Sequence, residues 1–418
     1  MIVFEKKVFG TNLMFYTQLV GSSFPKAFWP AVISIIIYII LIHVIPEDTK
    51  NNYVVNDTYT YGIAASAIGF LVVFRLNQAH IRLSEAAQDV YTLEANILSS
   101  VLSIHSYYRS DNVDKKKKDD RLLKYCFKLH SLLFSFGLLS LRKDDSFNID
   151  VYTNIEKKEE VNKSSITSSG NKAFELDSYE CYRPQSFISK IFYATSMRQP
   201  NSTYYNNHKL GIYSELTPKE KQVLLSLKDS RTRYKVVLSW IFEWLMLVQQ
   251  GELQHVPATI YARLFQVLSD ANYGFSRACR VAEVPFPFVI AQCAELSVGS
   301  LIFLVPFLNV SVVDDNTALG SVLTFLTVFM FISLYESARD IEDPFLYEPN
   351  QLPLVSLSMR SCKAFESIRQ NSYGQHDFYK NQYIEKDAVV DNNDNDTDIA
   401  HTNTSGVTIE MVEENRIK

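Results

Sequence analysis

The sequence predicts an all-α membrane protein with four transmembrane helices and a cytosolic helical domain. Four apolar segments occur in two pairs, and each is close to the roughly 20 residues that a helix needs to cross a bilayer. The loop inside each pair is short and acidic, whereas Lys and Arg lie outside the pairs. By the positive-inside rule, both termini and the long stretch between the pairs are therefore expected in the cytosol.

The composition narrows the function classes. The chain has 418 residues, 47% of them hydrophobic, and a net charge of -5 with both signs interspersed, which argues against a nucleic-acid binder. Its five cysteines form no Cys-x-x-Cys pair, so we expect neither a zinc nor a redox site. No Gly-rich phosphate loop, His-Glu-x-x-His or Gly-x-Ser-x-Gly motif is present. We therefore expect no enzyme activity, no metal and no cofactor.

The first transmembrane hairpin is expected at residues 27–80, after an N-terminal cytosolic arm at 1–26. Its first crossing, 27–45, contains no Asp, Glu, Lys or Arg and is ended by Pro46. The stretch from Tyr61 to Asp89 begins apolar and then turns polar, with no Gly or Pro in its second half. This pattern predicts one long helix that leaves the membrane and continues into water.

Residues 81–283 have the spacing of amphipathic helices and form the expected cytosolic domain. Within it, segment 121–142 is very apolar but carries Lys124 and Lys128. We favour a buried helix of a cytosolic bundle for this segment, and a further crossing is the alternative. The polar stretch 143–180 is expected to be a flexible insertion.

Local signals mark the later elements. Thr217, Pro218 and Glu220 have the spacing of an N-cap, a first helical residue and the third residue of a capping box. The second transmembrane hairpin is expected at 284–336, and Glu295 lies in the middle of its first crossing. An ionisable residue there is either functional or paired with a neighbouring helix. The remaining segments are a cytosolic junction at 337–355 and a largely disordered C-terminal tail at 356–418.

The candidate functional residues lie on the long helix predicted at the first hairpin. Ser66, Phe70 and Phe74 occur at i, i+4 and i+8 and therefore share one helical face. Such a face either lines a pore or packs against other helices. Arg75 follows directly, and would attract anions if it faces water at the cytosolic mouth of a pore. Its alternatives are an interfacial arginine or a salt bridge between helices.

Several strings, in order and at matching spacing, resemble the bestrophin family of anion channels, closer to its plant, fungal and bacterial branch. Segment 71–86 contains Phe-Arg-x-Asn-x-Ala-x-x-Arg-x-x-Glu-Ala, and segment 284–292 contains Pro-x-Pro-Phe. Segment 338–354 contains Glu-Asp-Pro-Phe followed by Asn-Gln-Leu-Pro, and Gly21–Pro30 suits the family's Gly-Ser entry to the first crossing. The resemblance covers residues 15–355.

The resemblance implies a homopentamer around one pore that passively conducts chloride or other small anions. It places the hydrophobic neck at Ser66, Phe70 and Phe74, and Ser66 stands where other members carry apolar residues. A second, cytosolic constriction is expected at Leu268. The implied location is the plasma membrane or an endomembrane. The alternative function is a membrane scaffold or regulator that keeps the fold without conducting.

The resemblance also bears on calcium. Animal members of the family hold calcium with an acidic run at the position of residues 346–351, where only Glu348 is acidic in this chain. A calcium site gathers six to eight oxygen ligands, several of them carboxylates. We therefore expect calcium control to be weak or absent.

Overall fold

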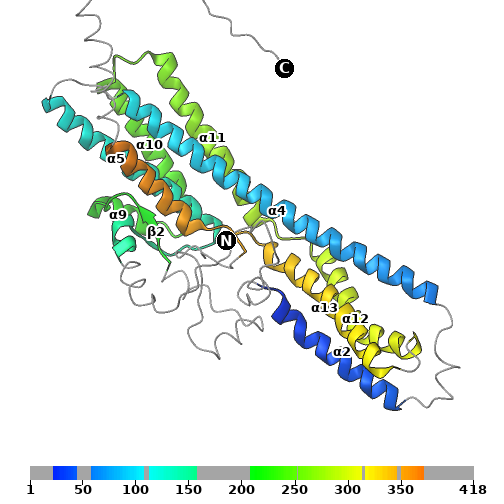
Figure 1. Ribbon diagram of the computed structural model, residues 1–418. Helices are drawn as coiled ribbons and strands as arrows, with labels where there is room; N and C mark the ends of the chain where they lie inside the picture. Colours follow the sequence, from blue (N-terminus) through cyan, green and yellow to red (C-terminus); the bar gives the residue numbers. More distant parts are fainter. Residues whose placement is uncertain are drawn as a thin grey trace, which may run out of the picture. The chain divides into compact units, whose positions relative to one another are not determined.

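The structure is a computed structural model that describes residues 22–44, 58–107, 113–157, 208–251, 253–312, 316–345 and 350–370. The chain divides into two compact units, Met1–Glu366 and Ser367–Lys418, and nearly all described residues belong to the first. The first unit is mostly helical, as predicted (Figure 1). Its elements are α2 (Phe24–Val44), α4 (Thr58–Tyr107), α5 (Val113–Leu141), β1 (Ile149–Val151), β2 (Leu210–Ile212), α9 (Pro218–Ser226), α10 (Ser230–Gly251), α11 (Ala258–Glu283), α12 (Phe288–Val312) and α13 (Thr317–Ile341).

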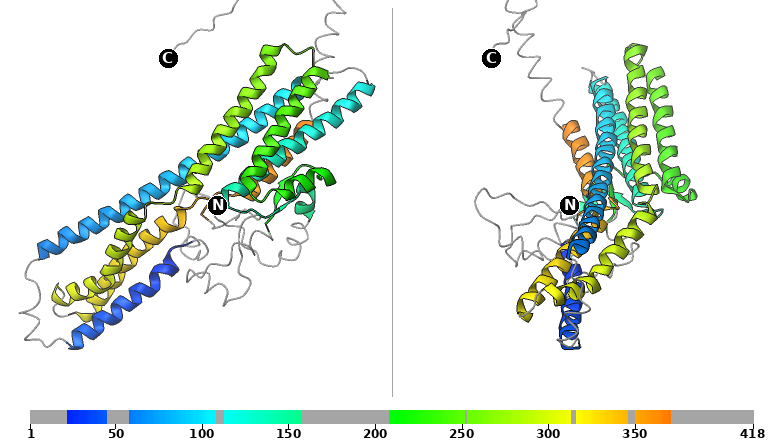
Figure 2. Two further views of the ribbon diagram at one scale, coloured as in Figure 1. Left: turned by 180° about the vertical axis from the view of Figure 1, so that it is seen from behind. Right: turned by 90° about the vertical axis from the view of Figure 1, so that its right-hand side faces the viewer.

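Helix α4 connects the two halves of this unit. It has 50 residues, which corresponds to about 75 Å at 1.5 Å per residue, far more than a bilayer core of about 30 Å. One end packs against α12 and α13, and the rest packs against α5 and α11 (Figures 1 and 2). The predicted long helix is therefore confirmed, and it extends beyond both ends of the predicted stretch.

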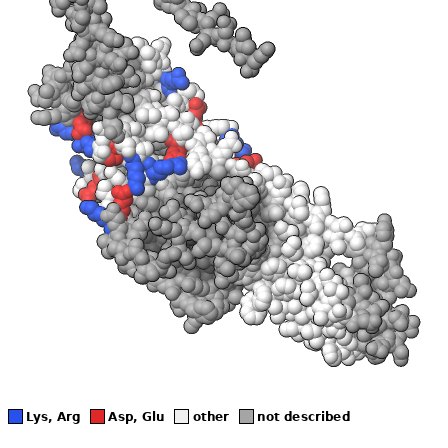
Figure 3. Space-filling model, in the orientation of Figure 1, with Lys and Arg blue, Asp and Glu red and all other residues white. Residues whose placement is uncertain are grey.

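The apolar half consists of α2, α12, α13 and the first part of α4. Its core is built from small and branched side chains, such as Ala27, Ala31 and Ala294 beside Val72 and Val328. Small residues let helix backbones approach closely, as they do between membrane helices. The outward faces remain apolar, and this end shows no charged residue on the side drawn in Figure 3. Such a surface suits contact with lipid or with other copies of the chain.

The bundle half consists of the second part of α4 with α5, α10, α11 and a helix that begins at residue 354. By length and composition alone, five of the described helices could cross a membrane: the four of the apolar half and α5. However, 83% of the most apolar window of α5 is buried inside the protein, against 17–28% for the other four. The apolar character of α5 is thus explained by the core that it fills, which favours the predicted bundle helix.

A buried histidine shows how tightly α5 is held. The Nδ1 atom of His130 lies 2.9 Å from the Cys126 carbonyl oxygen, and Nε2 lies 3.2 Å from the Ser100 hydroxyl on α4. The neutral ring with its proton on Nδ1 fits both contacts, since Nε2 can then accept from the hydroxyl. Complete burial lowers the pKa of His130 to about 4.

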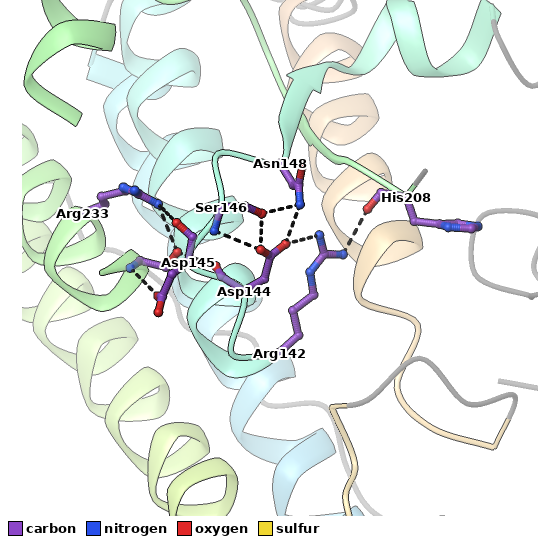
Figure 4. A network of polar contacts seen from close by, with 8 residues as sticks. Arg142, Asp144, Asp145, Ser146, Asn148, His208 and Arg233 are labelled. Atoms are coloured by element: carbon purple, nitrogen blue, oxygen red, sulfur yellow. Dashed lines mark hydrogen bonds and ion pairs between the residues drawn. The ribbon is translucent and has the colours of Figure 1, made fainter. Parts of the chain in front are cut away.

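The end of α5 is fixed by a polar network (Figure 4). Lys143 follows the helix with a positive φ of 56°, and the amide groups after Leu141 bond back to carbonyls of the last turn. Asp144 then accepts hydrogen bonds from Asn148 and Arg142 (both 2.9 Å) and from Ser146. Burial alone would raise the pKa of Asp144, but these donors outweigh it and hold the pKa below its ordinary value.

Two segments differ from the sequence-based expectation. Residues 143–157, expected in a flexible insertion, contain β1, which pairs in parallel with β2 in a two-stranded sheet. Residues 354–366, mostly expected in a disordered tail, form a helix whose Phe365 stacks on Phe127 of α5 with ring centroids 5.7 Å apart. By contrast, the predicted capping box at the start of α9 is confirmed in full.

Candidate functional site

The most distinctive surface of the apolar half is the face of α4 that carries the predicted neck residues. The Phe70 side chain is 74% exposed and the Phe74 side chain 38% exposed. Their rings stack with centroids 6.4 Å apart, and Ser66 one turn earlier is also exposed. A contiguous exposed apolar patch marks a surface that meets lipid, a partner or a ligand path. The structure thus brings all three predicted residues together on one uncovered face.

The same face continues past the aromatic pair. Residues 7, 11, 14 and 18 positions after Phe70 lie within about 40° of it around an α-helix. They are Asn77, Ile81, Ser84 and Gln88, and all four are exposed. We call this surface the Phe70 face: Ser66, Phe70, Phe74, Asn77, Ile81, Ser84 and Gln88. It changes from aromatic to polar while remaining uncharged, a feature that the helical spacing beyond Phe74 could have revealed from the sequence.

Arg75 lies outside the Phe70 face. Its side chain is only 4% exposed and its Nη2 atom lies 2.9 Å from a carboxylate oxygen of Glu342. Its guanidinium also lies 4.5 Å from the Tyr335 ring centroid and 5.6 Å from that of Phe286. Of the arrangements considered for Arg75, the structure contains the salt bridge between helices, because α4 turns this side chain toward the end of α13.

Leu268 is completely buried on α11 and therefore does not reach the surface of this chain. The apolar side of α11 packs against α4, which is why its leucines point inward. Ile260, in the first turn of α11, is 49% exposed.

The two acidic residues singled out in the sequence have different outcomes. Glu295 is exposed on α12. Glu348, the single acid of the segment where animal family members hold calcium, lies outside the described residues. Among the described residues, no group of three or more His, Cys, Asp or Glu could hold a metal ion.

Comparison with known proteins agrees with this architecture. Residues 207–365 match the family described as Bacterial/Fungal Bestrophin protein. The voltage-dependent anion channel-forming protein YneE of Salmonella typhi is 25% identical over 173 residues, which is 41% of this chain and 50% of that protein. YneE of Escherichia coli K12 is 26% identical over 152 residues, 36% of this chain and 46% of that protein. The chain thus matches about half the length of these curated relatives.

Solved structures extend the similarity in fold. A bacterial bestrophin homolog from Klebsiella pneumoniae superposes with a TM-score of 0.55 at 14% identity, covering 82% of this chain and 97% of that one. A variant of that homolog with a single substitution gives a TM-score of 0.57 at the same identity, covering 83% and 100%. At this identity the comparison establishes the fold alone.

These findings define a class: a helical, multi-pass membrane protein with the fold of the bacterial bestrophin homologs. The resemblance to the bestrophin family is confirmed by the family match, the curated relatives and the solved neighbours, and it is to the bacterial and fungal branch.

Proposed function

We propose that this protein is an anion channel that passively conducts chloride or other small anions across a bilayer. In this proposal five copies surround one pore, and the Phe70 face of each lines it. Four helices (α2, the first part of α4, α12 and α13) cross the membrane, and the bundle half and both termini are cytosolic. The single observation that carries the proposal is the exposed, stacked Phe70–Phe74 pair.

The chemistry of the Phe70 face suits a permeating anion. A ring of apolar side chains controls a pore by excluding water and needs no fixed charge. The edge of a phenylalanine ring is electropositive, so edges directed at a pore axis replace part of an anion's hydration. Five copies around an axis would also cover the exposed aromatic rings, since each face would then border a narrow pore.

Below the neck, the Phe70 face offers hydrogen-bond donors without charge. The amides of Asn77 and Gln88 and the hydroxyl of Ser84 donate to anions. Neutral donors bind a permeating ion weakly enough to release it, as conduction requires. Since Arg75 is paired with Glu342, it is not available as the anion-attracting mouth residue in this arrangement.

The proposed cytosolic constriction requires an apolar side chain that reaches the pore. Leu268 is buried against α4, so forming a constriction there would require α11 to turn. Ile260 is exposed on the same helix and meets the requirement without rearrangement. We therefore include Ile260 beside Leu268 as a candidate for this constriction.

Cysteine accessibility tests the lining of the pore. In a background with Cys181 and the exposed Cys293 replaced by serine, Asn77→Cys is reconstituted into planar bilayers and treated with a negatively charged thiol reagent. We expect chloride current to fall as the reagent reacts, whereas Met330→Cys, exposed on α13, should be unaffected. Full current after complete modification of Asn77→Cys would contradict the proposed path. Absence of any chloride current in the unmodified protein would favour the non-conducting scaffold.

A further inference from the structure

Two arginines of α4 converge on the end of α13. Arg75 and Arg82 are seven residues apart, so they lie on nearly the same side of the helix, about 120–140° around from Phe70. Arg75 forms its 2.9 Å salt bridge with the Glu342 carboxylate, and Arg82 donates from Nε to the Glu342 main-chain oxygen at 3.3 Å. Glu342 is the C-cap residue of α13. One residue thus receives both arginines, one through its side chain and one through its backbone.

Arg82 also holds the connection between α11 and α12. Its Nη2 atom donates to the carbonyl oxygens of Val281 (3.0 Å) and Val284 (2.9 Å), at the C-terminal end of α11. A cation there satisfies carbonyls that have no helical partner and opposes the negative end of the helix dipole. Phe286, in the same connection, contacts the guanidinium of Arg75. The two arginines therefore join α4, α13 and the α11–α12 connection.

The last turn of α13 makes two further contacts, both through Asp340. Lys26 of α2 forms an ion pair with Asp340 in the last turn of α13. The Gln351 side chain donates to the Asp340 carbonyl oxygen at 3.1 Å, so the segment leading to the helix at 354 is tied back to α13. Asp340 lies two residues before Glu342, which holds Arg75, and Arg75 directly follows Phe74 in the sequence.

We propose that Arg75, Arg82 and Glu342, here called the arginine cluster, act as positioning residues that set the orientation of Phe74 in the neck. This inference rests on the proposed channel function. The Arg75 side chain is only 4% exposed, and the Glu342 carboxylate 2.9 Å from its Nη2 atom supplies the counter-charge. Breaking a buried ion pair by removing one partner leaves an uncompensated charge, and α4 must shift to relieve it.

A positioning role differs from a pore-lining role in what it changes. The cluster side chains lie away from the Phe70 face, so their replacement should leave the ratio of chloride to sodium permeability unchanged. The time that the neck stays open should change, since the Phe74 ring is no longer fixed. A merely structural role would lower the amount of assembled protein without altering the gating of the channels that remain.

Single-channel recording of Glu342→Gln in planar bilayers tests this inference. We expect open probability to change at least several-fold at a fixed voltage with the permeability ratio unchanged. The matched control Asp343→Asn removes a carboxylate one residue away that is exposed, and should gate as the unmodified protein does. Arg75→Lys, which retains the charge, should show a smaller effect. Unchanged open probability in Glu342→Gln, or an altered permeability ratio instead, would overturn the inference.

A second measurement separates this inference from the channel proposal. In purified, assembled protein with the same Cys181 and Cys293 replacements, the rate at which Phe74→Cys reacts with a thiol reagent reports the exposure of the neck position. Glu342→Gln should change this rate several-fold, while the rate at Met330→Cys should stay the same. If the protein conducts no chloride but the Phe74→Cys rate responds, the channel proposal fails and the positioning role stands. If neither open probability nor the Phe74→Cys rate responds, the positioning role fails alone.

Discussion

Replacing Gly274 by alanine tests the packing that joins α11 to α4. A Cβ atom at Gly274 would lie 3.2 Å from the Asp89 carbonyl oxygen, 3.3 Å from the Leu93 amide nitrogen and 3.4 Å from a Thr92 methyl carbon. The two shortest contacts are to backbone atoms of α4, which cannot rotate away as a flexible side chain would. The added methyl group therefore requires the two helices to separate by a few tenths of an ångström.

The expected magnitude follows from two opposing terms. Overpacking of a tight contact costs typically about 1–3 kcal/mol. Alanine is more favourable than glycine in a helix interior by about 1 kcal/mol. We therefore expect Gly274→Ala to lower the free energy of unfolding by about 1 kcal/mol. Gly274→Val should cost more, since it brings further atoms against the same backbone.

Thermal unfolding of the purified protein in detergent, followed by circular dichroism, measures the effect. Gly251→Ala provides a matched control, because no atom lies within 4 Å of a Cβ at that position and the residue ends α10. The same chemical change should thus lower the melting temperature at Gly274 and leave it equal or slightly higher at Gly251. A Gly274→Ala protein as stable as the unmodified one would refute the close packing of α4 and α11.

Three further predictions concern the bundle half. Between pH 6.5 and 4, His130 should lower the free energy of unfolding by about 3 kcal/mol, because its side chain is protonated in the unfolded chain but stays neutral when buried. Urea titrations at several pH values should show a smaller loss of stability in His130→Gln. Lys128→Met breaks the buried ion pair with Glu220, whose carboxylate oxygens lie 2.8 and 2.9 Å from Nζ, and should lower the free energy of unfolding by about 3 kcal/mol. The double variant Lys128→Met/Glu220→Gln should recover part of this loss. Equal stability of Lys128→Met and the unmodified protein would contradict the buried pair. Lys143→Gly should raise stability by about 1 kcal/mol in the same titration, because glycine adopts positive φ without strain, and a loss would argue against that backbone geometry.

Much of the helical framework could be predicted because its signals are local. The charge-free segments mark α2 and α13, and the change from apolar to polar residues marks α4 as one continuous helix. The start of α9 could be predicted because a capping box needs only four consecutive residues. The spacing of Ser66, Phe70 and Phe74 gave a shared face that the structure leaves uncovered.

The remaining features depend on contacts between distant parts of the chain. The pairing of β1 with β2 joins residues 149–151 to residues 210–212 and leaves no periodic pattern in such short strands. The helix from residue 354 buries apolar side chains such as Leu357 and Phe365, but polar residues such as Ser358 and Ser361 are buried among them. These polar residues interrupt the apolar pattern, so the segment is hard to separate from the polar tail that follows. The burial of Leu268 depends on which side of α11 meets α4, and an apolar side chain alone does not reveal this.

Glu342 shows a different limit. Asp340, Glu342 and Asp343 lie close together in the sequence, yet the structure gives each of them different surroundings. Asp340 pairs with Lys26, Glu342 pairs with Arg75, and Asp343 is exposed. The position of the end of α13 against α4 decides which acidic side chain pairs with which basic one. The spacing of charges in the sequence does not predict this position.

The reversal potential of purified protein in a planar bilayer under a potassium chloride gradient is the most direct test of an anion pore at the Phe70 face. We predict a current that reverses near the chloride equilibrium potential, with the conductance raised when Phe70 and Phe74 are both replaced by alanine. Absence of current, or reversal at the potassium equilibrium potential, would contradict an anion pore. A double variant with unchanged conductance would contradict the placement of its neck.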